Sequence, residues 1–213
     1  FNMVSGIYTP TSGQISFWDK DDKVHVINKL GPAQLNKLGV ARTFQNIRLF
    51  GELSVKDNVL IALHNQRRVS VFDVLFRTPK FRRDEQVMSE KAMSLLELFK
   101  ISGKADEKAK NLPYGEQRKL EIVRALASNP KLLLLDEPAA GMNPQETKEL
   151  MELIAFIRKE FKLTILLIEH DMKLVMGICE RIMVLNYGRI IAAGTPEEIQ
   201  ANPEVVKAYL GNN

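Results

Sequence analysis

Two adjacent carboxylates follow a run of four leucines, at residues 132–135. A fully apolar run of this length is typical of a buried strand in a parallel sheet, and open α/β sheets bind ligands beyond the carboxyl ends of their strands. In that position Asp136 could hold Mg²⁺ through oxygen, and Glu137 could orient or deprotonate an attacking water. The same pattern also fits a strand that runs into an exposed acidic turn.

Three further segments carry polar groups whose chemical and structural explanations both stay open. Residues 112–117 form a glycine-containing loop ahead of an amphipathic helix. The free N–H groups of a helix start bind phosphate well, although an ordinary helix start can have the same sequence. His170 ends a second apolar run, where a histidine is more often structural than catalytic. Gln45 follows a short apolar stretch and has no specific meaning by itself.

The elements that must position these residues alternate between strand and helix in the C-terminal half of the chain. Apolar runs at residues 131–135 and 163–168 predict buried strands. Residues 143–146 predict a capped helix start with proline in its first turn. The tyrosine-glycine pair at residues 187–188 lies between two apolar segments and predicts a β-hairpin. Strands separated by helices imply a parallel α/β sheet.

The middle of the chain changes to helical periodicity, which predicts an inserted helical segment. Ser54 with Asp57 is typical of a helix N-cap ahead of an apolar stretch. Helical spacing over residues 84–100 places one set of apolar side chains on a single face, namely Val87, Met88, Ala92, Leu95, Leu96 and Phe99.

At the N-terminus, residues 1–5 resemble the end of a helix that stops at Gly6.

The composition is that of an ordinary soluble globular protein. The 213 residues are 45% hydrophobic and 26% charged, so the chain can bury a sizeable core, which excludes disorder as the main interpretation. The net charge of +4 is spread along the chain and favours neither nucleic acid nor a lipid surface as a partner. No apolar run approaches the ~20 residues that span a bilayer. The single cysteine, Cys179, fits a reducing compartment.

Taken in order, these segments resemble the ATP-binding subunits of ABC transporters. In that family the glutamine corresponding to Gln45 is the Q-loop, and the stretch corresponding to residues 112–117 is the signature. Asp136 with Glu137 corresponds to Walker B, and His170 corresponds to the switch histidine. The resemblance covers essentially the whole chain, because four separate motifs follow the family's order.

Three segments narrow the resemblance to importers of branched-chain amino acids, at residues 41–50, 137–144 and 168–177. The basic, aromatic stretch at residues 67–83 is similar to the longer of the two ATPase subunits in such systems. The implied function is ATP hydrolysis that powers import of leucine, isoleucine and valine through a membrane permease. Urea, amide or other amino-acid importers share much of the pattern. A soluble non-transport ABC ATPase or a non-catalytic ABC-fold interaction module stays open as another class.

The resemblance also implies a fold and a domain organisation. The implied fold is α/β, a P-loop NTPase-like ABC ATPase core with a mostly parallel sheet and an inserted α-helical subdomain. Residues 1–50 and 113–213 would form the core, and residues 51–112 would form the subdomain that contacts the permease. Exposed residues around Arg48 and Phe50, together with the basic, aromatic stretch, are the expected contacts, although a solvated basic loop explains them equally well.

The resemblance assigns catalytic, metal-binding and nucleotide-binding roles to the site residues, with ATP and Mg²⁺ as cofactors. Glu137 would polarise the attacking water, and His170 would support the γ-phosphate and the geometry of Glu137. Asp136 would anchor Mg²⁺, and Gln45 would sense both the metal and the water. The signature and the D-loop would contact the nucleotide of a partner subunit through Tyr114, Gly115, Glu116, Gln117 and Asn143.

The implied assembly is a transporter complex without nucleic acid. It contains two transmembrane permease subunits and a second ATPase subunit in a head-to-tail dimer. A periplasmic or lipoprotein solute-binding protein would act with it indirectly. The ATPase would lie peripherally on the cytoplasmic face of the inner (cell) membrane of a bacterium or archaeon.

Two departures from the family pattern matter for function. The P-loop, G-x-x-x-x-G-K-[ST], whose amides and lysine hold nucleotide phosphates, does not occur in these residues. In the family it lies immediately upstream of the segment that matches residues 1–6. We therefore expect a truncated sequence that lacks the N-terminal strands and the P-loop, and we expect residues 1–213 alone to be inactive. Pro113 stands where many members have serine, which removes one hydroxyl contact to the γ-phosphate.

Overall fold

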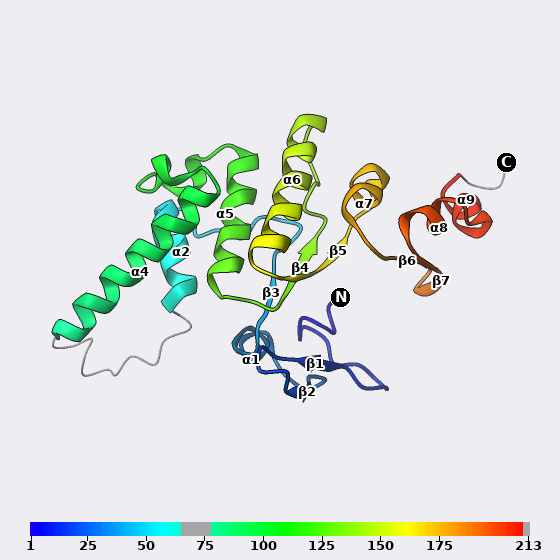
Figure 1. The fold of residues 1–213 in the computed structure, drawn as a ribbon, viewed down its shortest axis with the longest axis horizontal. Coiled ribbons are helices and arrows are strands. Elements are labelled where there is room, and N and C mark those ends of the chain that lie inside the picture. The colour runs from blue at the N-terminus through cyan, green and yellow to red at the C-terminus, as the bar shows by residue number, and fades with distance from the viewer. Residues whose placement is uncertain (65–77, 211–213) are drawn as a thin grey trace.

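The computed structural model describes residues 1–64 and 78–210 (Figure 1). Strands and helices alternate along much of the chain, and η marks a 3-10 helix. The elements in chain order are β1 (Ser16–Trp18), β2 (Val24–Val26), α1 (Pro32–Leu38), β3 (Val40–Arg42), α2 (Val55–His64), α4 (Pro79–Leu98), η1 (Ser102–Lys104), η2 (Ala109–Asn111), α5 (Tyr114–Ala127), β4 (Leu132–Asp136), α6 (Pro144–Glu160), β5 (Thr164–Ile168), α7 (Met172–Ile178), β6 (Ile182–Asn186), β7 (Arg189–Gly194), α8 (Pro196–Gln200) and α9 (Pro203–Leu210).

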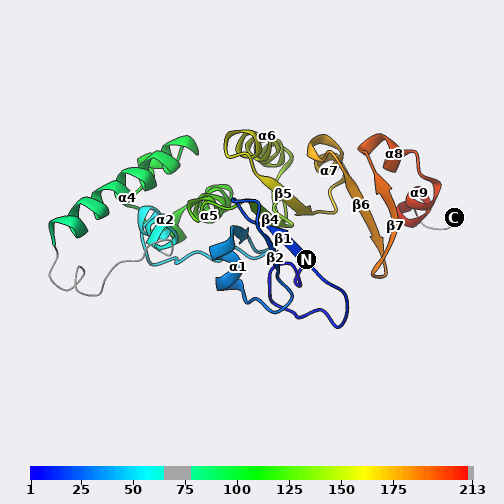
Figure 2. The same ribbon diagram turned by 60° about the horizontal axis from the view of Figure 1, so that its bottom comes forward.

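The centre of the fold is a parallel sheet with the strand order β3-β4-β5. Its middle strand is buried on both faces, because successive side chains of a strand point to opposite sides. Leu133 and Leu135 join the large apolar cluster that includes residues of α5 and α6. Leu134 joins the cluster formed with the N-terminal strands and α1. Figures 1 and 2 show α5 and α6 on one side of the sheet and β1 and β2 on the other.

The N-terminal layer covers the second face of the sheet. β1 and β2 pair antiparallel, with Phe17 opposite His25, and Phe17 packs with Leu35 of α1. The predicted helix end at residues 1–5 is a series of turns, in which the N–H of Ser5 donates to the carbonyl of Phe1 at 3.0 Å. Gly6 follows with a φ of +72°, the left-handed conformation in which glycine commonly ends a helix.

The helical middle of the chain packs α2 and α4 against each other and against α5. The N-cap predicted for α2 is confirmed, since the N–H of Asp57 donates to Oγ of Ser54 at 2.9 Å. The apolar stripe predicted on α4 is confirmed at Met88, Ala92, Leu95, Leu96 and Phe99. The prediction is wrong for Val87, because its side chain is 55% exposed.

The C-terminal part forms a small layer of its own. β6 and β7 pair antiparallel as the predicted hairpin, and they form a separate sheet beside α8 and α9. Thr195 caps α8 by accepting a hydrogen bond from the N–H of Glu198. Among residues 1–64 and 78–210, no helix has both the length and the apolar character needed to cross a membrane.

Candidate functional site

Three neighbouring strand ends bring together Gln45, Asp136, Glu137 and His170. β3, β4 and β5 run parallel and in register, so the residues that follow each strand meet at one edge of the sheet. This convergence agrees with the grouping that the sequence predicted for the catalytic and metal-binding residues.

Glu137 lies at the centre of this group. Its backbone N–H donates to the carbonyl of Ile168 at 2.9 Å, which fixes the start of the loop after β4. Its φ of +43° is in the left-handed region, which non-glycine residues adopt infrequently. Its Oε2 accepts a 2.8 Å hydrogen bond from Nε2 of Gln45. The carboxylate is 28% exposed, so water can reach it.

His170 lies beside this carboxylate without contacting it. Its side chain is 74% exposed, and its Nδ1 is 4.0 Å from Oε1 of Glu137, which is longer than a hydrogen bond. The neighbouring Glu169 is 1% exposed and accepts hydrogen bonds from the N–H of Ala139 and the N–H of His170. The buried Glu169 therefore holds the backbone on both sides of the site, and its Oε2 lies 3.9 Å from Nδ1 of His170.

Asp136 is the last residue of β4, and its Oδ2 accepts a 2.7 Å hydrogen bond from Nη2 of Arg42. In the described part of the chain, no group of three or more acidic, histidine or cysteine side chains could hold a metal ion. Mg²⁺ commonly keeps several waters and binds through one or two carboxylates plus substrate phosphates. The residues therefore fit a cation that is bound together with a phosphate ligand.

The signature segment begins α5, and its side chains turn toward their own chain. Pro113 occupies the N-cap position and has no side-chain acceptor for the first N–H groups of the helix. Tyr114 donates its hydroxyl to the carbonyl of Ala140 at 2.9 Å. Gln117 donates its amide to the carbonyl of Leu112 at 2.8 Å. The signature and the loop after β4 are thereby joined within one subunit.

Glu116 and Gly115 have different surroundings at the same helix start. Both carboxylate oxygens of Glu116 accept hydrogen bonds from Nζ of Lys104, at 2.6 and 2.8 Å. A Cβ at Gly115 would lie 3.4 Å from Oε1 of Glu146, so the starts of α5 and α6 approach closely there. A larger side chain at position 115 would meet that carboxylate.

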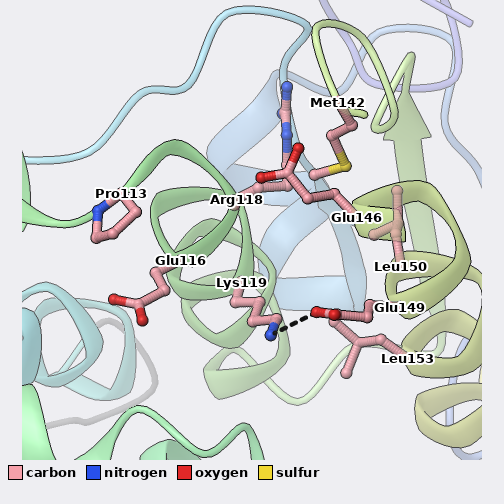
Figure 3. A pocket seen from close by; sticks show the side chains of 10 residues that line it. Pro113, Glu116, Arg118, Lys119, Met142, Glu146, Glu149, Leu150 and Leu153 are labelled. Carbon is pink, nitrogen blue, oxygen red and sulfur yellow. Dashed lines mark ion pairs between the residues drawn. The ribbon is translucent and has the colours of Figure 1, made fainter. Parts of the chain in front are cut away.

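A cavity of about 190 Å³ lies between the beginnings of α5 and α6 (Figure 3). Gly115, Met142 and Glu146 line it on the side of the signature. Figure 3 shows the carboxylate of Glu116 turned away from Met142 and Glu146. Lys119 and Glu149 lie at the other end, with 3.7 Å between Nζ and Oε2.

Asn143 forms the N-cap of α6. Its Oδ1 accepts hydrogen bonds from the N–H groups of Gln145 and Glu146, at 2.9 and 3.0 Å. The carboxylate of Glu146 in turn accepts the N–H of Asn143 at 2.9 Å. This capping box confirms the predicted helix start, and it commits the side-chain oxygen of Asn143 to the helix.

The sequence reasoning missed a buried ion pair on α5. Arg118 is 0% exposed, and its Nη1 donates to Oε2 of Glu121 at 2.8 Å. Burial raises the pKa of the Glu121 carboxyl above its usual range, although the Arg118 charge and three hydrogen bonds act in the opposite direction. Helical periodicity did not identify this pair, because it places charged residues such as Arg118 and Glu121 on the solvent-exposed side of an amphipathic helix, whereas both are buried here.

Sequence comparison places the chain among known transport proteins. A family model described as ABC transporter matches residues 1–140, and one described as branched-chain amino acid ATP-binding cassette transporter matches residues 189–213. The chain is 49% identical to the high-affinity branched-chain amino acid transport ATP-binding protein LivG of Escherichia coli (strain K12), over 99% of this chain and 81% of that protein. It is 46% identical to the corresponding protein BraF of Pseudomonas aeruginosa, with the same coverage.

Solved structures agree with the fold. A nucleotide-free ATP-binding cassette from an ABC transporter has a TM-score of 0.78 at 31% identity, over 99% of this chain and 82% of that one. The ADP conformation of an ATP-binding cassette has a TM-score of 0.79 at 31% identity, with the same coverage. The predicted α/β ABC ATPase fold is confirmed. The chain belongs to the ATP-binding cassettes of ABC transporters.

Proposed function

We propose that this chain is the ATP-hydrolysing subunit that powers import of branched-chain amino acids through a membrane permease. The observation that carries this proposal is the hydrogen bond from Gln45 to Glu137 at the strand ends. It supplies an oriented carboxylate in a chain that is 49% identical to a branched-chain amino acid transport ATP-binding protein. A carboxylate held in this way can orient and polarise a water that attacks a phosphoryl group.

Each side chain at the strand ends has a distinct role in this proposal. Glu137 acts as the general base, and Gln45 holds its carboxylate by donating a hydrogen bond to Oε2. His170 moves from its exposed position to support the terminal phosphate. Mg²⁺ would be held through Asp136 with Gln45 nearby, and when bound it neutralises charge on the phosphate oxygens.

The signature contributes through its backbone in this proposal. Among the predicted nucleotide contacts, Tyr114, Glu116 and Gln117 each use a side-chain polar group within their own chain, and Asn143 uses its side-chain oxygen. We assign the backbone N–H groups at the start of α5, next to Gly115, as donors to the phosphates of a nucleotide held by a second subunit. The partial positive charge of a helix start favours such an anion.

The assembly that we propose has two ATP-binding subunits, head to tail, with two permease subunits and an indirectly acting solute-binding protein. It places this chain peripherally at the cytoplasmic face of a bacterial or archaeal cell membrane. We also propose that residues 51–112 form a helical subdomain that contacts the permease, between core segments 1–50 and 113–213. Phe50 is 50% exposed, which suits such a contact. The basic, aromatic stretch predicted for the same contact lies mostly outside the described residues.

Uptake by proteoliposomes tests this function directly. Vesicles carry the permease and the ATP-binding subunit that contains residues 1–213, and they take up labelled leucine or labelled urea after addition of binding protein and internal ATP. We expect ATP-dependent leucine uptake that the Glu137→Gln variant abolishes. Uptake of urea alone would assign the subunit to another importer, and absence of ATP hydrolysis would favour a non-catalytic module.

We further propose that residues 1–213 produced alone bind ATP weakly and do not hydrolyse it. The support for this is the sequence itself, which contains no G-x-x-x-x-G-K-[ST] motif to hold the phosphates.

A further inference from the structure

The buried guanidinium of Arg118 holds the loop that carries Gln45. Its Nη1 donates to the carbonyl of Phe44 at 2.7 Å, and its Nη2 donates to the carbonyl of Gln45 at 2.8 Å. These partners lie 74 and 73 residues earlier in the chain. The side chain therefore connects α5 directly to the backbone that follows β3.

Glu121, one turn further along α5, holds the same loop through its amides. Its Oε1 accepts the N–H of Phe44 at 3.4 Å and the N–H of Arg48 at 3.3 Å, while its Oε2 accepts Nη1 of Arg118. One ion pair thus contacts both carbonyl and N–H groups of residues 44–48. Complementary contacts of this kind fix the position and the orientation of a backbone segment.

The network continues to the loop that follows β4. Nη2 of Arg118 donates to the hydroxyl of Tyr114 at 3.3 Å, and that hydroxyl donates to the carbonyl of Ala140 at 2.9 Å. Gln45 reaches the same loop through its hydrogen bond to Glu137. The signature, the loop after β3 and the loop after β4 are therefore joined through a single buried guanidinium.

Stability alone gives little reason to bury this pair. Replacing a buried ion pair with apolar residues of similar volume is often neutral or stabilising. Arg118 is also imperfectly satisfied, because its Nε is buried without a hydrogen-bond partner in the part of the chain that the structure describes. The contacts that an apolar pair could not replace are those to residues 44–48.

We propose that Arg118 and Glu121 are positioning residues that hold the backbone of residues 44–48, and thereby set where Gln45 meets Glu137. The positioning itself depends only on the contacts above. Its consequence for turnover rests on the proposed function, in which Glu137 acts on the attacking water.

Hydrogen exchange tests the positioning without nucleotide. The double variant Arg118→Met/Glu121→Leu, made in residues 1–213, removes both charges while keeping apolar volume on α5. We expect backbone amides in peptides covering residues 43–49 to exchange about tenfold faster, with unchanged exchange in β4 and α6. The matched control is Lys119→Met/Glu149→Gln, which removes a partly exposed ion pair between α5 and α6 (Figure 3). The control should leave residues 43–49 unchanged.

Two results would overturn the positioning role. One is unchanged exchange at residues 43–49 in the double variant, and the other is faster exchange throughout the chain, which indicates general support of the core. Should the double variant fail to fold, Glu121→Gln serves instead. It keeps the shape and removes the charge, so it should accelerate exchange at residues 43–49 by a smaller factor, and an unchanged rate would again count against the role.

Steady-state kinetics separate this inference from the proposed function. In the reconstituted transporter, the double variant should lower kcat for ATP about 10- to 100-fold with little change in KM, because a small misplacement of a reacting group is costly. The single variant Arg118→Lys keeps the positive charge but lacks the two-nitrogen fork, so its kcat should also stay below that of the wild type. Local exchange that rises while the wild type hydrolyses no ATP would uphold positioning and reject the ATPase function. If the wild type hydrolyses ATP and the double variant shows unchanged exchange and unchanged kcat, the ATPase function is upheld and the positioning role is rejected.

Discussion

Nε2 of Gln45 donates a 2.8 Å hydrogen bond to Oε2 of Glu137, although 92 residues separate the two in the chain. The contact forms because β3 and β4 are neighbours and end at the same edge of the sheet. It orients a carboxylate whose own backbone has a φ of +43°. A carboxylate held from both its backbone and its side chain is well placed for a chemical role.

Glu137→Gln should uncouple nucleotide binding from hydrolysis. The variant keeps the shape of the side chain but loses the base, so kcat should fall about 100-fold or more while the Kd for ATP stays the same. Phosphate release and nucleotide titration on the reconstituted subunit measure the two quantities. The control is Glu152→Gln, which makes the same carboxylate-to-amide change at an exposed position of α6 and should keep wild-type turnover. Wild-type turnover in Glu137→Gln would exclude Glu137 as the base.

Asn143 allows its capping role to be separated from a role toward nucleotide. Asn143→Ala removes the acceptor for two N–H groups of α6 and should lower the free energy of unfolding by about 1 kcal/mol, whereas Asn143→Asp should retain it. Urea denaturation measures the free energy of unfolding of both variants and of the wild type. If ATP turnover falls in Asn143→Asp at unchanged stability, the side-chain amide contacts nucleotide. Equal stability of all three proteins would contradict the cap.

The buried Glu121 predicts a specific dependence of stability on pH. Burial raises the pKa of its carboxyl in the folded chain, so the folded state binds more protons than the unfolded chain between the two pKa values. This stability is fully present below the unfolded pKa and is lost as pH rises through the folded one. The Tm of the wild type minus that of Glu121→Gln should therefore decrease from about pH 4 upward.

Thermal unfolding monitored by circular dichroism in steps of pH measures this difference. For a chain of this size, about 1 kcal/mol corresponds to 2–4 °C, which is readily resolved. A difference in Tm that grows as pH rises would show that the ion pair with Arg118 outweighs the cost of burial.

Residues 1–213 as a separate polypeptide should bind Mg-ATP too weakly for a micromolar Kd. The phosphate-cradling amides and lysine of a P-loop are not present in this sequence. Isothermal titration calorimetry measures the affinity, and a fusion that places a P-loop segment ahead of Phe1 is the positive control. Micromolar binding by the unfused polypeptide would mean that the groups described above suffice to hold the nucleotide.

Much of the local structure could be predicted because its causes are local. The cap at Asn143, the leucine run of β4 and the hairpin at β6 and β7 depend on neighbouring residues and on periodicity. The order of four motifs was enough to indicate the family. The exposed Val87 shows the limit of this reasoning, since the packing partners that decide burial are distant in sequence.

The sequence by itself determined which chemical groups this protein carries and which elements hold them. Only the tertiary structure decided which groups meet. Glu116 could have faced a ligand, but its carboxylate pairs with Lys104. Arg118 and Glu121 look like ordinary helix charges, yet they are buried against a loop 73–77 residues away. The physical reason is that burying a charge is costly unless a partner is supplied, and that partner is set by the packing of α5 against β3.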